Sequence, residues 1–262
     1  MLNRLLAIKA LAVALVAMMP AAAADLELNT PGKLTVSTEG TFPPFSMRAP
    51  SGQLDGVEIR LWTEIAERLG LEYQPLVMRW ESTLVGLLAG QFDVMGTTMD
   101  ITPTRAEQIL YSDGWLQSGG VLVVREGSDI ASVEDMAGRI IGALTASTYI
   151  EHAQPFGPAA VRAYQSESDA LQDLVNGNIE GVVTDQVAAA YAIKTSGLPL
   201  RIAEGFVSEV QKGWGFQKTR PNLARAVNQA LADMKADGTY AAIMTEILGI
   251  VPMPADPIRS NF

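Results

Sequence analysis

The chain has 262 residues, with 19 basic side chains, 29 acidic ones and a single histidine, for a formal net charge of −10. This acidic balance argues against a nucleic-acid-binding protein, which needs a basic surface. Cysteine is absent, so disulfides, thiol nucleophiles and cysteine-ligated metal sites are excluded, and one histidine excludes a multi-histidine metal site. These limits favour a binding protein over a metal or triad enzyme, and we expect no cofactor.

The first 24 residues have the three parts of a secretory signal peptide. Arg4 and Lys9 make a basic start, an uncharged apolar run covers 10–19, and four alanines follow Pro20. The run is shorter than the ~20 apolar residues of a membrane-spanning helix, which is the alternative. We expect export to the periplasm with cleavage after Ala24, and no lipid anchor because no cysteine follows the cut.

Beyond this leader, short apolar strands alternate with amphipathic helices. For example, apolar residues recur at 57, 61, 65 and 69 at a helical spacing, and Gly70 follows at the position that commonly ends a helix. The predicted strands are 33–37, 73–78, 92–95, 140–144, 161–164 and 179–184. The predicted helices are 57–69, 83–89, a short one from Thr102-Pro103, 147–152, 168–175, 185–194, 221–235 and 239–248. This alternation predicts an α/β protein with parallel sheets.

Segments 88–97 and 175–184 repeat one pattern: a helix end, a glycine, an acidic residue, an apolar strand and a threonine. Ligands of open α/β sheets bind beyond the carboxyl ends of the strands. Two such ends predict two α/β lobes that face one cleft. The alternative is that helix–glycine–strand junctions commonly look alike.

Eight segments in order resemble the periplasmic solute-binding proteins of polar amino-acid ABC importers, the bacterial extracellular family 3. They are TEGTFPPF from Thr38, LDGV from Leu54, GTTMDITPTR from Gly96, YSD from Tyr111, SVEDMAG from Ser132, TAST from Thr145, VTD from Val183 and KADGTY from Lys235. They span nearly all of residues 33–248.

The resemblance implies a two-lobed periplasmic-binding-protein fold of type II, in which each lobe is a parallel-rich sheet flanked by helices. Lobe 1 would hold 25–117 plus 213–262, and lobe 2 would hold 118–212, with crossings near Ser118–Val121 and Gln211–Gly213. A ligand would bind in the cleft and the lobes would close over it by hinge motion. The implied partners are an inner-membrane permease and its ATPase, since the chain has no P-loop, and the implied state is a monomer.

Arg105 lies just inside the helix that starts at Thr102-Pro103. A bidentate guanidinium there would suit the carboxylate of an amino acid, and the resemblance places the carboxylate site on this arginine. The alternative is a surface pair with Glu107 or Asp113. By the same resemblance, Thr148 would add a hydroxyl to the carboxylate site and Asp185 would take the α-ammonium. Both have helix N-capping as the alternative role.

Five further residues match ligand-contacting positions of the family. Thr97 and Thr98, at a strand end, would offer backbone groups to the ligand, or merely reflect the β-propensity of threonine. Phe42 and Trp80 would sandwich the ligand side chain, or belong to the core. Glu39 would read the end of that side chain, or be a solvated loop residue. Tyr149 is a further candidate, and His152, on the same predicted helix, is expected at the surface or at the edge of the cleft.

Asp100 departs from the family, in which many relatives carry serine or threonine. With Asp100, Asp185 and Glu39 against one arginine, the cleft would favour a cationic ligand. The segment around Glu39 instead resembles relatives that bind cystine or other polar neutral amino acids. The sequence therefore predicts a receptor for a polar L-amino acid and leaves the charge of its side chain open.

A different class on the same scaffold is the secreted cyclohexadienyl or arogenate dehydratase. Such an enzyme would need a general acid in the cleft, a role that Glu39 or Asp100 could fill. The acidic cleft disfavours prephenate, which carries two carboxylates, so we expect a receptor and no enzyme.

Overall fold

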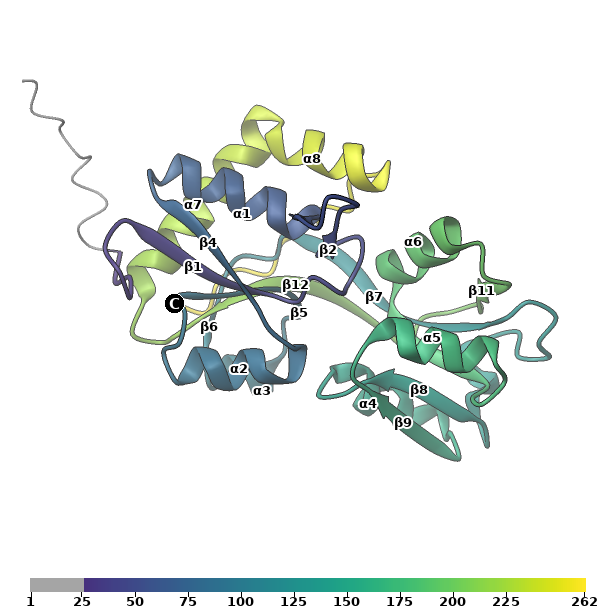
Figure 1. Ribbon diagram of the computed structural model, residues 1–262. Coiled ribbons are helices and arrows are strands. Elements are labelled where there is room, and N and C mark those ends of the chain that lie inside the picture. Colours follow the sequence, from purple (N-terminus) through teal and green to yellow (C-terminus); the bar gives the residue numbers. More distant parts are fainter. Residues whose placement is uncertain (1–25) are drawn as a thin grey trace, which may run out of the picture.

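A computed structural model describes residues 26–262, and the predicted signal peptide lies outside these residues. The described chain forms two lobes joined by two long strands, β7 (Leu116–Arg125) and β12 (Ser208–Phe216) (Figure 1). This confirms the predicted two-lobed α/β fold. The predicted crossing segments, Ser118–Val121 and Gln211–Gly213, lie within these two strands. None of the helices in 26–262 has the length and apolar character needed to cross a bilayer.

The remaining strands include the six predicted ones, in the predicted order, and four short ones that the sequence did not predict. They are β1 (Lys33–Thr38), β2 (Met47–Arg48), β3 (Leu54–Asp55), β4 (Glu72–Val77), β5 (Val94–Asp100), β6 (Leu110–Tyr111), β8 (Ile140–Leu144), β9 (Ala160–Tyr164), β10 (Gly181–Asp185) and β11 (Leu200–Ile202). β5 continues to Asp100, well past the predicted end at residue 95, because its ladder with β12 pairs Asp100 with Lys212.

The helices are also close to their predicted positions. They are α1 (Val57–Arg68), α2 (Trp80–Leu88), α3 (Pro103–Ala106), α4 (Thr148–Ala153), α5 (Glu167–Val175), α6 (Gln186–Ser196), α7 (Pro221–Asp237) and α8 (Thr239–Leu248), with short 3-10 turns at Val133–Met136 and Gln154–Phe156. α2 begins three residues before the predicted start, so Trp80 is its first residue and packs into the core below it.

One sheet path runs through both lobes in the order β4-β1-β5-β12-β7-β10-β8-β9. The outer neighbours pair in parallel, as β1 does with β4 and β5, and β8 with β9 and β10. The central strands β12 and β7 pair antiparallel with their neighbours. The carboxyl ends of β5 and β10 therefore approach each other from opposite lobes, as the repeated sequence pattern predicted.

Each lobe has a core on both faces of its sheet. In lobe 1, Val94 of β5 faces the core under α1, α7 and α8, while its neighbour Met95 faces the core under α2. In lobe 2, Leu122 of β7 faces α4, while Val123 faces α5 and α6. This alternation is the expected consequence of the strand's two-residue period, and it fixes which face of each strand end reaches the cleft.

Candidate functional site

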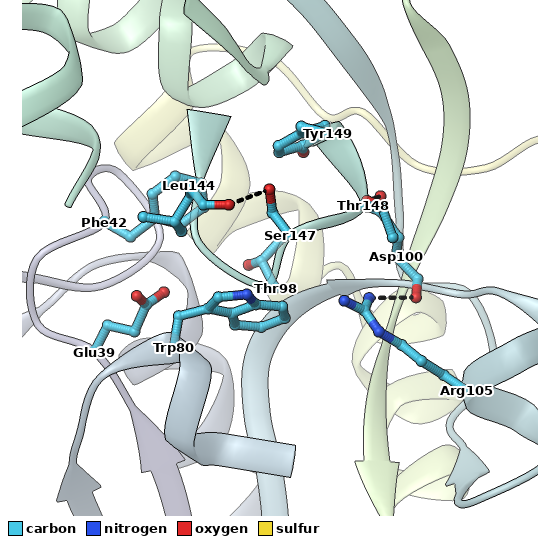
Figure 2. A pocket seen from close by; sticks show the side chains of 10 residues that line it. All are labelled: Glu39, Phe42, Trp80, Thr98, Asp100, Arg105, Leu144, Ser147, Thr148 and Tyr149. Carbon is cyan, nitrogen blue, oxygen red and sulfur yellow. Dashed lines mark hydrogen bonds between the residues drawn. The ribbon is translucent and has the colours of Figure 1, made fainter. Parts of the chain in front are cut away.

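A cavity lies between the lobes at the ends of β5 and β8 (Figure 2). It contains about 340 Å³ of empty space, counting its open mouth. Its lining residues are Glu39, Phe42, Trp80, Thr98, Asp100 and Arg105 from lobe 1 and Leu144, Ser147, Thr148 and Tyr149 from lobe 2. The structure thus brings seven of the predicted site residues, and the further candidate Tyr149, around one space. Two predicted residues, Thr97 and Asp185, do not line it.

Arg105 points along one wall of this cavity. The predicted cap is present: the Thr102 hydroxyl accepts a hydrogen bond from the Arg105 backbone N–H, which fixes the start of α3. The Arg105 guanidinium lies 5.3 Å from the centre of the Trp80 ring and donates to the Asp100 carbonyl at 3.2 Å. The alternative surface pairs are not formed among residues 26–262, since Asp113 instead pairs with Arg259. Most of the donors of this guanidinium are therefore left for a ligand.

Lys212 of β12 lies between the two aspartates that the sequence singled out. Its ammonium is 2.5 Å from Asp100 Oδ1, 2.8 Å from Asp185 Oδ2 and 3.0 Å from the Tyr149 hydroxyl. All four side chains are buried. Burial alone would lower the pKa of the Lys212 ammonium, but the Asp185 and Asp100 carboxylates outweigh it and raise this pKa well above its usual value. Lys212 is therefore a cation at any physiological pH.

The Asp100 carboxylate is ionised for the same reason. Burial raises its pKa, but the Lys212 ammonium outweighs this effect, so the pKa of Asp100 lies below its usual value. Its other oxygen accepts a hydrogen bond from the Thr148 hydroxyl. This contact joins the two lobes across the cavity and uses the hydroxyl that the sequence assigned to a ligand carboxylate.

Asp185 lies behind this cluster with no exposed surface. One carboxylate oxygen caps α6 through the N–H groups of Val187 and Ala188, and the other accepts from Lys212 and from the Ser118 hydroxyl at 2.8 Å. The sequence predicts that Asp185 contacts the ammonium of a ligand. In the structure the Lys212 ammonium already occupies that carboxylate. The alternative N-cap role is present.

Lys212 was missed as a site residue, because its segment was interpreted only as a hinge crossing. The sequence carried a signal. Lys212, Trp214 and Phe216 alternate along β12 and therefore share one face of the strand. Since the other two are large and apolar, a lysine in register with them has to be buried, and a buried lysine needs acidic partners.

The acidic side chain at the opposite end of the cavity is Glu39. Burial, together with repulsion from Glu58, raises the pKa of Glu39 to about 8. Burial also raises the pKa of Glu58 and of Glu167 to about 7, although each accepts hydrogen bonds from a neighbouring threonine. At neutral pH Glu39 is therefore largely a protonated carboxyl. Nowhere in 26–262 do three or more acidic, histidine or cysteine side chains come together in a way that could hold a metal ion.

Aromatic and threonine residues complete the walls. Phe42 and Trp80 are nearly buried and face the cavity, as Figure 2 shows. The Trp80 indole N–H has no hydrogen-bond partner among the described residues. The Thr98 N–H, predicted to face a ligand, donates to Glu58 instead. Thr97 is buried in β5, and its hydroxyl likewise lacks a partner within 26–262.

Known proteins of one family are similar to this chain in sequence and in fold. Residues 34–250 match the model of the bacterial extracellular solute-binding proteins, family 3. The L-cystine-binding protein TcyJ of Escherichia coli is 30% identical over 221 residues, which is 83% of each chain. The histidine-binding periplasmic protein of Escherichia coli is 29% identical over 222 residues, 80% of this chain and 85% of that one.

Solved structures agree. An ancestral arginine-binding protein bound to glutamine superposes with a TM-score of 0.79 at 33% identity, over 84% of this chain and all of the other. The ancestral amino-acid-binding protein AncCDT-1, described as a precursor of cyclohexadienyl dehydratase, superposes with a TM-score of 0.77 at 29% identity, over 83% of this chain and 96% of that one. The chain belongs to the bacterial extracellular solute-binding proteins, family 3, whose members named here bind amino acids.

Proposed function

We propose that this protein is the periplasmic receptor of an ABC importer and captures a polar L-amino acid or a related carboxylate solute. It would be exported with its signal peptide cleaved after Ala24, carry no lipid anchor, act as a monomer, and deliver the ligand to a membrane permease driven by an ATPase. Arg105 is the observation that carries this proposal: a guanidinium that faces a cavity between two lobes, with a backbone carbonyl as its only hydrogen-bond acceptor within 26–262.

The cavity suits a ligand with one carboxylate and a polar or apolar remainder. A bidentate contact with Arg105 would fix the carboxylate, and the rings of Phe42 and Trp80 would cover the aliphatic part. The charge argument for a cationic ligand is weakened, because Lys212 offsets one of the two charges of Asp100 and Asp185, Arg105 offsets the other, and Glu39 is largely protonated. A neutral side chain therefore fits this cavity better than a cationic one.

Closure would occur by hinge motion between 25–117 plus 213–262 and 118–212. The two segments that connect these parts are β7 and β12, which pair with each other at Gly120 and Ser208 and at Leu116 and Lys212. Side-chain contacts between the lobes near the cavity are both polar, as between Thr148 and Asp100, and apolar, as between Leu144 and the cluster that contains Trp80, so opening would break both kinds. A ligand held by both lobes would favour the closed form.

A second candidate is the cyclohexadienyl dehydratase activity. One observation favours it: Glu39 is a largely protonated carboxyl in the cavity, as a general acid for loss of a hydroxyl group must be. The named relatives in transport favour the receptor.

A ligand screen separates the two functions. The chain without residues 1–24 is unfolded and refolded to remove co-purified ligand, and its melting temperature is recorded with each L-amino acid, cystine, ornithine, prephenate and arogenate. A ligand of the native state raises this temperature by mass action. A shift with an amino acid supports the receptor. Release of phenylpyruvate from prephenate would show the enzyme, and no shift with any carboxylate would contradict both.

A further inference from the structure

Each of the three protons of the Lys212 ammonium has a hydrogen-bond acceptor. It has three N–H groups and no lone pair. The structure gives it three acceptors: Asp100 Oδ1 at 2.5 Å, Asp185 Oδ2 at 2.8 Å and the Tyr149 hydroxyl at 3.0 Å. The side chain is 1% exposed. It is a buried cation that lies behind Asp100 and Tyr149, which line the cavity, and these side chains together with Asp185 satisfy it.

Both carboxylates around Lys212 also have a donor on each of their oxygens. One oxygen of Asp185 accepts from the N–H groups of Val187 and Ala188, and the other accepts from Lys212, from Ser118 and from the Tyr149 hydroxyl at 3.4 Å. The oxygens of Asp100 receive Lys212 and the Thr148 hydroxyl. A second ammonium at this place would have to displace one of these donors and would meet the charge of Lys212 at close range.

Two side chains that line the cavity have free donors. Arg105 uses one of its N–H groups on the Asp100 carbonyl, and the Trp80 indole N–H has no partner among the described residues. Both line the same cavity, as seen in Figure 2. Such a set is complementary to a carboxylate with a second oxygen acceptor nearby, and it offers little to an α-ammonium.

We propose that Lys212 determines the ligand class: it supplies the cation that Asp100 and Asp185 hold, so the cavity selects carboxylates without an α-ammonium, such as 2-oxo and 2-hydroxy acids, over the matching α-amino acids. This inference rests on the proposed receptor function and narrows its ligand. Arg105 binds the carboxylate, and the 2-oxo or 2-hydroxy oxygen accepts from Arg105 or Trp80. Lys212 acts through its charge and through the two aspartates that it occupies.

Matched ligand sets test this selection. The ligand-free chain without residues 1–24 is titrated by calorimetry with L-alanine, pyruvate and L-lactate, then with L-phenylalanine, phenylpyruvate and L-phenyllactate, then with L-methionine and its 2-oxo and 2-hydroxy analogues. In at least one set we expect the oxo or hydroxy acid to bind at least tenfold more tightly than the amino acid. Tighter binding of the amino acid in every set that responds would overturn the inference.

A double variant, Asp100→Asn with Lys212→Met, provides a second test of the inference. Removing Lys212 alone leaves two buried carboxylates without their cation, whereas the double variant leaves one, Asp185, with an uncharged Met and Asn beside it. It should recover an ammonium site and shift the preference at least tenfold toward the amino acid. Lys218→Met, an exposed lysine six residues further on, is the control and should leave the preference unchanged. An unchanged preference in the double variant would also overturn the inference.

The outcomes distinguish a failure of this inference from a failure of the proposed receptor function. If amino acids bind the natural chain more tightly than their analogues, the receptor stands and the role of Lys212 is refuted. If no carboxylate of these sets and no ligand of the thermal screen binds either protein, the proposed function fails and the inference fails with it.

Discussion

Arg105 and Lys212 are two cations near one cavity: Arg105 lines the space, Lys212 lies behind the residues that line it, and the two differ in what surrounds them. Arg105 has a carbonyl and an aromatic ring for neighbours, so its charge is available to a ligand. Lys212 lies between two carboxylates and a phenol, so its charge is fully used inside the protein. The comparison shows that the number of charged residues near a site does not predict the electric field that a ligand meets there. Positive and negative charges that pair with each other inside the protein are no longer available to the ligand.

The largest effect should come from removing the paired cation. Lys212→Met leaves Asp100 and Asp185 buried without a counter-charge, and we expect the free energy of unfolding to fall by about 3–5 kcal/mol. Urea denaturation of both proteins measures it. Lys218→Met, at an exposed lysine, should change stability by less than about 0.5 kcal/mol. A loss below about 1 kcal/mol for Lys212→Met would contradict the closed ion cluster.

Removing the available cation should affect binding instead. Arg105→Ala deletes the carboxylate site, and we expect affinity to fall at least a hundredfold, which corresponds to about 2.7 kcal/mol. Calorimetry with the best ligand of the screen measures this loss. Arg105→Lys keeps the charge without the planar fork and should recover only part of the affinity. The melting temperature of the empty protein should hardly move, and near-normal affinity in Arg105→Ala would place the carboxylate elsewhere.

Two buried glutamates that do not line the cavity, Glu58 and Glu167, should show in the pH dependence of stability. Burial raises the pKa of Glu58 and of Glu167 to about 7, from 4.5, so the native protein holds protons there that the unfolded chain has released. Stability should therefore fall as pH rises from about 4.5 to 7. Glu167→Gln, which mimics the protonated form, should reduce this slope by up to about 1.4 kcal/mol per pH unit.

The control for this pH effect is Asp237, a carboxyl that titrates at a lower pH. Backbone and side-chain hydrogen bonds from Thr239 lower the pKa of Asp237 to about 2, so its contribution is lost only in more acidic solution. Asp237→Asn should therefore leave the slope above pH 4.5 unchanged. A Glu167→Gln protein with the slope of the natural chain would mean that this carboxyl is ionised throughout.

The smallest effect concerns the support of Arg105. Thr102→Ala removes the side-chain cap of α3, and we expect a loss of about 1 kcal/mol in stability. Because the cap sets the backbone position of Arg105, ligand affinity should fall as well, by less than in Arg105→Ala. Thr102→Ser keeps the capping oxygen and should restore both. Loss of affinity in the serine variant would show that the methyl group, not the cap, matters.

The sequence by itself determined the helices, six of the strands, their order and most of the cavity, but it did not predict β7 and β12, which join the lobes, as strands. Helical spacing and glycine positions located α1 and α8 to within a residue, because these signals are local. The resemblance gathered Glu39, Phe42, Trp80, Asp100, Arg105 and Thr148, which the fold does bring together. Their use by a ligand stays a prediction.

Only the tertiary structure decided which charges remain available. Asp100, Asp185 and Lys212 come from β5, β10 and β12, and their pairing depends on the register of Lys212 with Asp100 and on the approach of lobe 2. No local pattern encodes a contact between residues that are 112 positions apart. The extension of β5 past residue 95 has the same origin, since a ladder with β12 fixes its length, and burial between lobes, not sequence, sets the pKa of Glu39.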